Sequence, residues 1–130
     1  MRANLTTIMA IALLCISPAG NAFAQGLKQF SGVAAFYSAD YSGRTARGDR
    51  YDPNKFTAAH RSLPFGTRLR VTDVKSRRSV VVVVNDRGPF TKGRVLDLSL
   101  AAAKALHMTG RGLMKVTAEI QSAAAYSTLQ

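Results

Sequence analysis

Carboxylates are the residues of this sequence best suited to acid–base chemistry, and Asp86 stands out among them by its context. It comes after five consecutive valines and Asn85, and it precedes Arg87, Gly88 and Pro89. A strand that ends here places the carboxyl at the rim of a sheet or barrel beside apolar walls, where a general acid can reach a substrate. An aspartate at a strand end is also commonly a turn residue that caps backbone amides. The local sequence gives these two roles equal weight.

His60 and Asp49 are the next candidates, and local sequence favours an ordinary role for both. His60 lies between an expected helical turn at 56–60 and a break at Leu63-Pro64. A partly buried structural histidine is the simpler interpretation of that context. Asp49 lies in the glycine- and arginine-rich segment 40–51, which is typical of an exposed loop with solvated side chains.

Asp97 interrupts an otherwise apolar strand and receives a structural interpretation. We expect it to form an ion pair with Arg87 or Arg94, or to accept backbone amides ahead of the following helix. The histidines at 60 and 107 have no paired spacing, so no zinc site is predicted. The sequence has no glycine-rich phosphate loop and no serine-centred elbow. We therefore expect neither a metal nor a cofactor.

Short strands are the elements that must position these residues. Segments 67–74 and 113–120 alternate apolar and polar residues, which predicts half-buried strands. Segments 30–38 and 95–98 are further expected strands, and the valine-rich segment 79–85 predicts a strand buried on both faces. Ser99 is a suitable N-cap for a helix over 100–107. Five or six short strands with one short helix indicate a compact β-barrel.

The first 24 residues have the pattern of a signal peptide. Arg2 precedes an apolar run at 5–16, and Ala22-Phe23-Ala24 supplies the small-x-small site that predicts cleavage before Gln25. The run is too short to span a membrane. Leucines precede Cys15 where a lipid-anchor site requires a small residue, so we expect no anchor there. The mature chain, without cysteine, is expected to be periplasmic or secreted.

Charge limits the class of partner. The sequence contains 18 Lys and Arg against 7 Asp and Glu, a formal net charge of +11. Such a surface favours polyanions such as nucleic acid, anionic membranes or acidic wall polymers. Export makes nucleic acid the least favoured of these partners, and an acidic wall polymer the most favoured.

Five segments, taken together, resemble the rare lipoprotein A family. They run in the family's order over about 90 residues: Gly32–Tyr37, Gly43–Asp49, Thr57–Thr67, Asn85–Phe90 and Arg94–Ser99. The resemblance implies an all-β fold, a six-stranded double-psi β-barrel with one or two short helices, over residues 25–122. Residues 123–130 are expected to form a flexible tail, and the protein is expected to be a monomer.

The same resemblance implies a lytic transglycosylase that cuts the β-1,4 bond between N-acetylmuramic acid and N-acetylglucosamine in peptidoglycan. It places the catalytic aspartate at Asp86 and the active-site histidine at His60. A third family position, usually glutamate, falls on Asp49, which is one methylene shorter. The resemblance also implies supporting or substrate-binding roles for a further set of residues, namely Arg87, Thr45 and Tyr37.

A single carboxyl is compatible with this reaction, because the sugar's own 6-hydroxyl acts as the nucleophile and yields a 1,6-anhydro product. Ordinary glycosidases require two carboxylates. A glucanase on this barrel would therefore need Asp49 as a second acid. The main alternative is a non-catalytic peptidoglycan-binding or expansin-like wall-loosening module.

Overall fold

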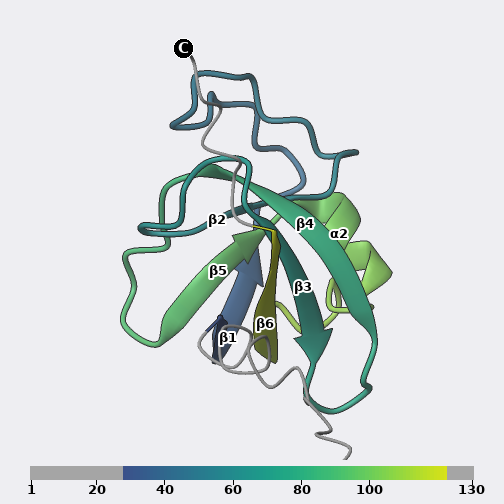
Figure 1. Cartoon of the computed structure of the whole chain (residues 1–130). Helices are drawn as coiled ribbons and strands as arrows, with labels where there is room; N and C mark the ends of the chain where they lie inside the picture. The colour runs from purple at the N-terminus through teal and green to yellow at the C-terminus, as the bar shows by residue number, and fades with distance from the viewer. Residues whose placement is uncertain (1–27, 123–130) are drawn as a thin grey trace, which may run out of the picture.

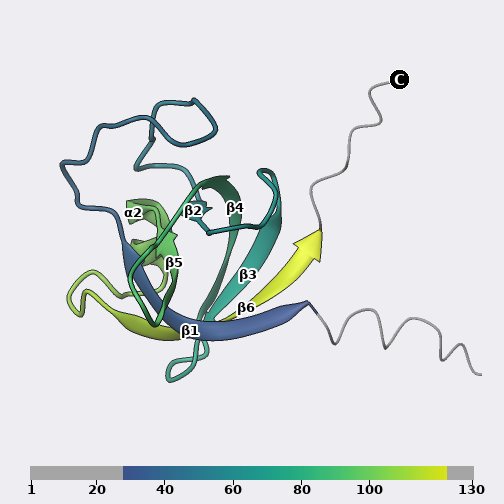
Figure 2. The ribbon, with the colours of Figure 1, turned by 90° about the vertical axis from the view of Figure 1, so that its left-hand side faces the viewer.

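The computed structural model describes residues 28–122, which form a closed barrel of six strands (Figures 1 and 2). The strands are β1 (Gln29–Phe36), β2 (Thr57–Ala59), β3 (Arg68–Asp73), β4 (Ser79–Asp86), β5 (Arg94–Leu98) and β6 (Met114–Ser122). They close in the order β1-β5-β2-β4-β3-β6, and β6 pairs again with β1. The β1–β5 and β2–β4 pairs are parallel and the others antiparallel. The expected all-β, six-stranded barrel is confirmed.

Alternation of apolar and polar residues builds the barrel interior as the sequence predicts. Leu69 and Val71 of β3 are fully buried, whereas Arg68 and Arg70 face solvent. The strand side chains that fill the interior are almost completely inaccessible: Leu69, Val71, Val82, Val84, Leu96, Leu98, Val116 and Ala118. Burial of these side chains is the main driving force for closing the barrel.

Two sequence-based expectations are wrong. Residues 56–60 form no helical turn, because residues 57–59 are the strand β2, which pairs with β4 on one edge and β5 on the other. Those long-range backbone hydrogen bonds outweigh local propensity. The valine strand β4 is fully buried on one face only, since Val81 is 39% exposed. Its other face therefore lies on the outside of the barrel at Val81.

One helix, α2 (Leu100–Ala105), occurs within residues 28–122. Ser99 caps it as expected, because its side-chain oxygen accepts a hydrogen bond from the Ala102 N–H. The helix ends two residues before the expected boundary, and His107 adopts a positive φ of 55°. No helix in this part of the chain is long and apolar enough to cross a membrane. The signal peptide at 1–24, Cys15 and the tail at 123–130 lie outside the described residues.

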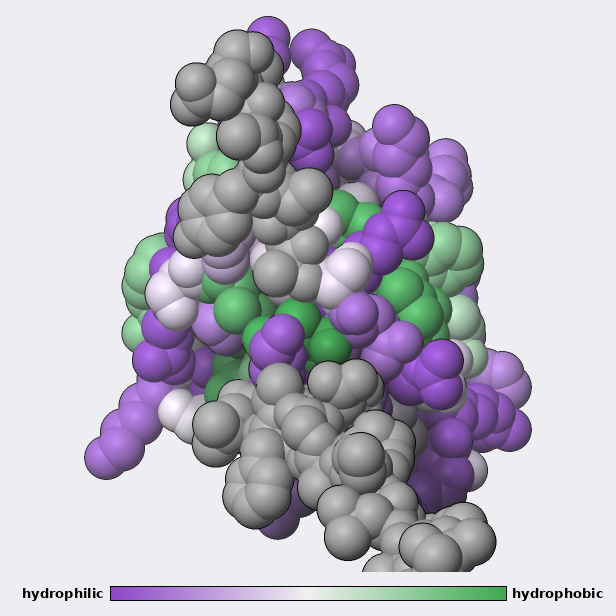
Figure 3. All heavy atoms as spheres, in the orientation of Figure 1, coloured by the Kyte–Doolittle hydropathy of each residue, from purple (hydrophilic) through white to green (hydrophobic). Residues whose placement is uncertain are grey.

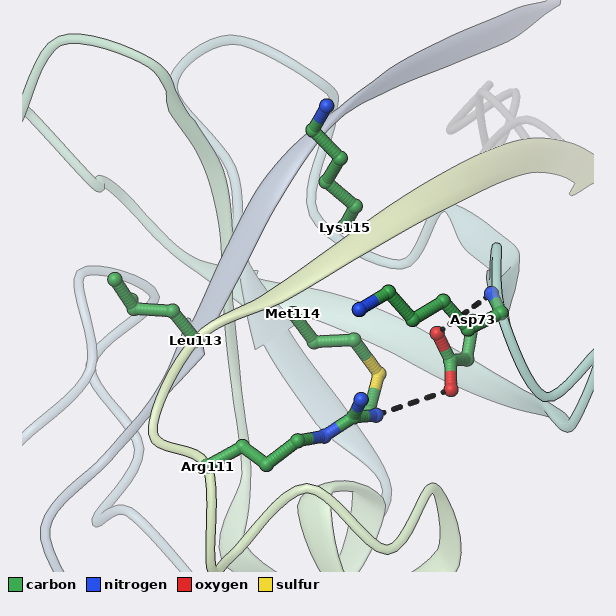
Figure 4. A pocket seen from close by; sticks show the side chains of 6 residues that line it. Asp73, Arg111, Leu113, Met114 and Lys115 are labelled. Carbon is green, nitrogen blue, oxygen red and sulfur yellow. Dashed lines mark hydrogen bonds and ion pairs between the residues drawn. The ribbon is translucent and has the colours of Figure 1, made fainter.

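The β3–β4 turn lies at the opposite end of the barrel from Asp86, because β4 runs from that turn to Asp86. A pocket of about 380 Å³ opens beside the turn, with Asp73 and Arg111 joined across it (Figure 4). Asp73 is 1% exposed and accepts hydrogen bonds from the backbone N–H groups of Lys75 and Ser76. Hydrogen bonds from Ser76, Lys75 and Arg111 hold the pKa of Asp73 at about 2. Asp73 therefore anchors the turn as a buried, charged acceptor.

Replacing Asp73 should reveal this anchor as a pH-dependent contribution to stability. We expect Asp73→Asn to lower the free energy of unfolding by about 1–3 kcal/mol at pH 7, because charge-assisted hydrogen bonds are lost. The folded-state pKa lies below the ordinary 3.8, so this stabilisation is complete above about pH 4 and is lost as the pH falls toward 2. Urea denaturation of both proteins between pH 7 and pH 2 measures the difference.

Glu119→Gln is the matched control, because Glu119 is exposed on β6. It should change stability by no more than about 0.5 kcal/mol at any of these pH values. An Asp73→Asn difference that stays constant down to pH 2 would contradict the anchoring role.

Candidate active site

The Asp86 carboxylate is fixed by three hydrogen-bond donors. Its Oδ1 accepts from the backbone N–H groups of Ala46, at 2.7 Å, and Arg87, at 2.8 Å. Its Oδ2 accepts from the Tyr37 hydroxyl at 2.5 Å. The surroundings are therefore polar donors rather than the apolar walls that the sequence indicated. Both carboxylate oxygens therefore accept hydrogen bonds, two of them from Tyr37 and Ala46, which are distant in sequence. These bonds fix the orientation of the carboxyl group.

Tyr37 is a protonated donor at this site. It follows β1, and its backbone N–H donates to the Leu98 carbonyl of β5. Burial raises the pKa of the Tyr37 hydroxyl far above its ordinary value of 10, and the hydrogen bond to Asp86 and the charges of Asp86 and Asp97 raise it further. A hydroxyl can donate or accept. Tyr37 can therefore keep its contact with Asp86 whether or not the carboxyl carries a proton.

Residues 37–56, here called the long loop, bring a backbone donor to Asp86. The loop lies above the barrel in Figure 1, and its surface is largely hydrophilic in Figure 3. Two backbone hydrogen bonds form within the loop: the Thr45 N–H donates to the Asp49 carbonyl and the Gly48 N–H to the Thr45 carbonyl. The Arg47 N–H donates to the Asn85 carbonyl at 3.3 Å, which ties the loop to the end of β4.

Thr45 and Asp49 occupy different positions in the long loop. Thr45 is 5% exposed, and its hydroxyl has no hydrogen-bond partner among the described residues. The Asp49 side chain is 54% exposed and lies 3.8 Å from the Arg47 guanidinium. No hydrogen bond within residues 28–122 joins Asp49 to Asp86 or to His60. Thr45 is thus an internal part of the loop, whereas Asp49 faces solvent.

His60 is held as a neutral ring with a defined tautomer. Its Nδ1 accepts the backbone N–H groups of Ser62, at 3.1 Å, and Leu63, at 3.0 Å. In the neutral ring the proton is therefore assigned to Nε2. Burial lowers the pKa of His60 below its ordinary 6.5, and the positive charges of Arg87 and Arg61 lower it further. His60 can thus act as a hydrogen-bond donor through Nε2.

Two arginines cross between the segments that carry His60 and Asp86. We call residues 60–66 the histidine loop and residues 87–93 the proline loop. Arg87 Nη1 donates to the carbonyls of Leu63, at 2.7 Å, and His60, at 3.3 Å. Arg61 reaches the opposite way: its Nε donates to the Pro89 carbonyl at 2.8 Å. Each loop therefore donates an arginine to the backbone of the other.

A cleft of about 390 Å³ lies along the histidine loop. The His60 ring lines it and packs against Phe30, with 5.1 Å between ring centroids. Arg61, Ser62, Leu63 and Val95 complete the lining. The His60 side chain and the Asp86 carboxylate form no direct hydrogen bond in the described structure. They are linked through the backbone, because the His60 N–H donates to the Asp86 carbonyl at 3.1 Å.

Asp97 has the structural role that the sequence indicated, and it also lies near Asp86. It forms the expected ion pair with Arg94. It also pairs with Ala59 in β2, which pairs on its other edge with Asp86. Since neighbouring strands lie about 4.8 Å apart, the two aspartate Cα atoms lie roughly 10 Å from each other. The interrupted apolar strand was the available sequence signal, and only the pairing of β2 places Asp97 near Asp86.

Sequence comparison relates the chain to wall enzymes. A family model described as lytic transglycolase matches residues 29–118. A Nostoc sp. protein named probable endolytic peptidoglycan transglycosylase RlpA is 56% identical over 94 residues, which are 70% of this chain and 25% of that protein. The endolytic peptidoglycan transglycosylase RlpA of Pasteurella multocida is 46% identical over 90 residues, 68% of this chain and 31% of that protein. The chain therefore spans about a quarter to a third of these relatives.

Solved structures share the barrel. The Streptomyces papain inhibitor superposes with a TM-score of 0.59 at 23% identity, over 71% of this chain and 93% of that one. A mutant Clavibacter michiganensis expansin in complex with cellohexaose gives 0.58 at 24% identity, over 72% of this chain and 50% of that one. Identities this low establish the common fold alone.

The environment of His60 makes a prediction that NMR can check. We expect the His60 ring to titrate below 6.5 and to carry its neutral-state proton on Nε2, because burial and two arginines disfavour the charged ring. Arg87→Met removes one of those charges and should move the pKa upward toward 6.5. The control Arg70→Met lies on the outer face of β3 and should leave the pKa unchanged. A His60 titration above 6.5 would show that the predicted environment is wrong.

Proposed function

The chain belongs to the lytic transglycolase family of double-psi β-barrels, and on that premise we propose that it is an endolytic peptidoglycan lytic transglycosylase. The substrate is the glycan strand, cut at the β-1,4 bond between N-acetylmuramic acid and N-acetylglucosamine. Similarity at 45–56% identity to named peptidoglycan transglycosylases supports the reaction class. The single observation that carries the assignment to this barrel is the Asp86 carboxyl held by Tyr37, Ala46 and Arg87.

In this proposal Asp86 is both acid and base. Its proton passes to the glycosidic oxygen as the bond from that oxygen to C1 of the muramyl sugar breaks. The sugar's 6-hydroxyl then bonds to C1 and returns its proton to Asp86, so that no water is consumed. The carboxylate formed midway is stabilised by the three donors, which already point at its oxygens and need no reorganisation.

The remaining site residues receive distinct roles. Neutral His60 donates from Nε2 to a polar group of a sugar in the cleft, and Tyr37 orients Asp86. Arg87 positions the histidine loop, and Thr45 supports the long loop from within. Asp49 is exposed and is available to hydrogen-bond sugar at the groove entrance.

The setting of the reaction is proposed with it. We place the protein outside the cytoplasm at the cell wall, after removal of residues 1–24, and as a monomer. Basic side chains on the surface attract the lactyl and stem-peptide carboxylates of peptidoglycan, and this attraction should weaken as salt is added. The likeness to expansins concerns the fold, so a non-catalytic binding module is kept as an outcome of the test below.

Sacculi incubated with the mature protein and analysed by mass spectrometry test the proposal. We expect 1,6-anhydro-muramyl ends from the wild type, and a loss of about 10²–10⁴-fold in rate for Asp86→Asn, which removes the acid. Asp40→Asn is the control, because Asp40 is an exposed carboxylate in the same long loop. Reducing ends would indicate a hydrolase, and unchanged glycan that pellets with protein a binding module.

His60→Ala separates a role in the reaction from a structural one. We expect a folded protein with about 10- to 100-fold lower activity, because one hydrogen bond to substrate is lost. Circular dichroism and thermal unfolding check the fold beside the activity assay. An unfolded variant would assign His60 to structure alone.

A further inference from the structure

Two large aromatic rings remain exposed beside the Asp86 site. Phe90 is 80% exposed and Tyr41 39% exposed. Single exposed hydrophobic side chains are common on protein surfaces, but two exposed rings beside one polar centre form a candidate ligand-binding surface. Phe90 lies in the proline loop and Tyr41 in the long loop, the two segments that adjoin Asp86.

Contacts tie Tyr41 to the acid through Tyr37. The Tyr41 and Tyr37 rings lie 5.2 Å apart between centroids, with 30° between their planes. Tyr37 in turn donates to Asp86. Tyr51 packs edge-on against Tyr41 at 5.4 Å, and its hydroxyl accepts the Leu100 N–H at the start of α2. The Tyr41 ring is therefore braced from within the protein while part of it stays open to solvent.

Phe90 and the Asp97 carboxylate both lie beside Gly88. A Cβ at Gly88 would lie 3.7 Å from the Phe90 ring and 4.0 Å from Asp97 Oδ2, so the ring and the carboxylate adjoin the same backbone position. Gly88 has a φ of 121°, a conformation that favours glycine. Arg61 holds the next residue by donating to the Pro89 carbonyl. The Phe90 ring is thus carried on a fixed turn at the site.

A sugar ring is the ligand that this combination fits. A pyranose has an apolar face of C–H groups and a polar rim of hydroxyls, so it can stack on an aromatic ring while its rim bonds to carboxylates. A stem peptide offers carboxylates, which the negative face of an aromatic ring does not attract. Basic side chains elsewhere on the surface suit those charges better.

We propose that Tyr41 and Phe90 are two sugar-stacking surfaces that hold successive pyranose rings of the glycan backbone across the Asp86 site. This inference rests on the proposed function, because it identifies residues with which that site binds its substrate. It adds two binding residues that supply no proton.

Calorimetric titration with peptide-free glycan strands tests the inference on the Asp86→Asn background, where the ligand stays intact. Tyr41→Ala and Phe90→Ala should each raise Kd by about tenfold or more, because each removes a buried ring face from the complex. Tyr41→Phe and Phe90→Tyr keep the stacking face and should stay within about twofold of the parent. Thermal unfolding of each variant confirms that it is folded.

Leu113→Ala is the matched control, because Leu113 is 56% exposed and lines the pocket near the β3–β4 turn. It should leave Kd unchanged. Unchanged affinity in both alanine variants would overturn the inference, as would equal losses in the aromatic replacements. Displacement of the glycan by free stem peptide would also overturn it.

The same variants separate this inference from the proposed function. If the wild type releases anhydro products while Tyr41→Ala and Phe90→Ala leave Kd unchanged, only the proposal of stacking surfaces is wrong. If glycan binding depends on both rings while the wild type releases no anhydro products, the reaction is wrong and the binding surface stands.

Discussion

The three residues of β2 join the two halves of the site, because Ala59 pairs with Asp86 of β4 on one edge and Asp97 of β5 on the other. The first pair is parallel and the second antiparallel, so β2 makes the direct connection between β4 and β5 in the order of the barrel. Without β2 both strands would have an open edge. The next residue along the chain is His60, whose backbone N–H donates to the Asp86 carbonyl. Barrel closure and site assembly therefore depend on the same few backbone hydrogen bonds.

The sequence predicted the elements whose signal lies in neighbouring residues or in a regular alternation. The alternation in β3 and β6 and the Ser99 cap could be derived from the sequence, since each is a property of neighbouring residues. β2 could not, because three residues carry no period and become a strand only through distant partners. The contact from Tyr37 to Asp86 spans 49 positions for the same reason. Local chemistry made Asp86 a candidate acid with even odds, whereas the family resemblance raised those odds and alone assigned His60 and Tyr37 to the site.

A formal charge of +11 leads one to expect arginines that face only solvent and anions. Arg61 and Arg87 instead direct their guanidinium groups at backbone carbonyls, and Arg87 lies 4.0 Å from the centroid of the Phe65 ring. Their charge has a second effect, since both lower the pKa of His60. Part of the positive charge thus fixes loop geometry and keeps a nearby imidazole neutral.

The crossed arginines also limit how this architecture can be altered. The backbone of each loop accepts a hydrogen bond from an arginine of the other loop. The conformation of each loop therefore depends on the sequence of both. Replacing residues 60–66 with a segment that has no arginine at position 61 removes the hydrogen bond that holds the Pro89 carbonyl. Residues 60–66 and 87–93 therefore have to be exchanged together.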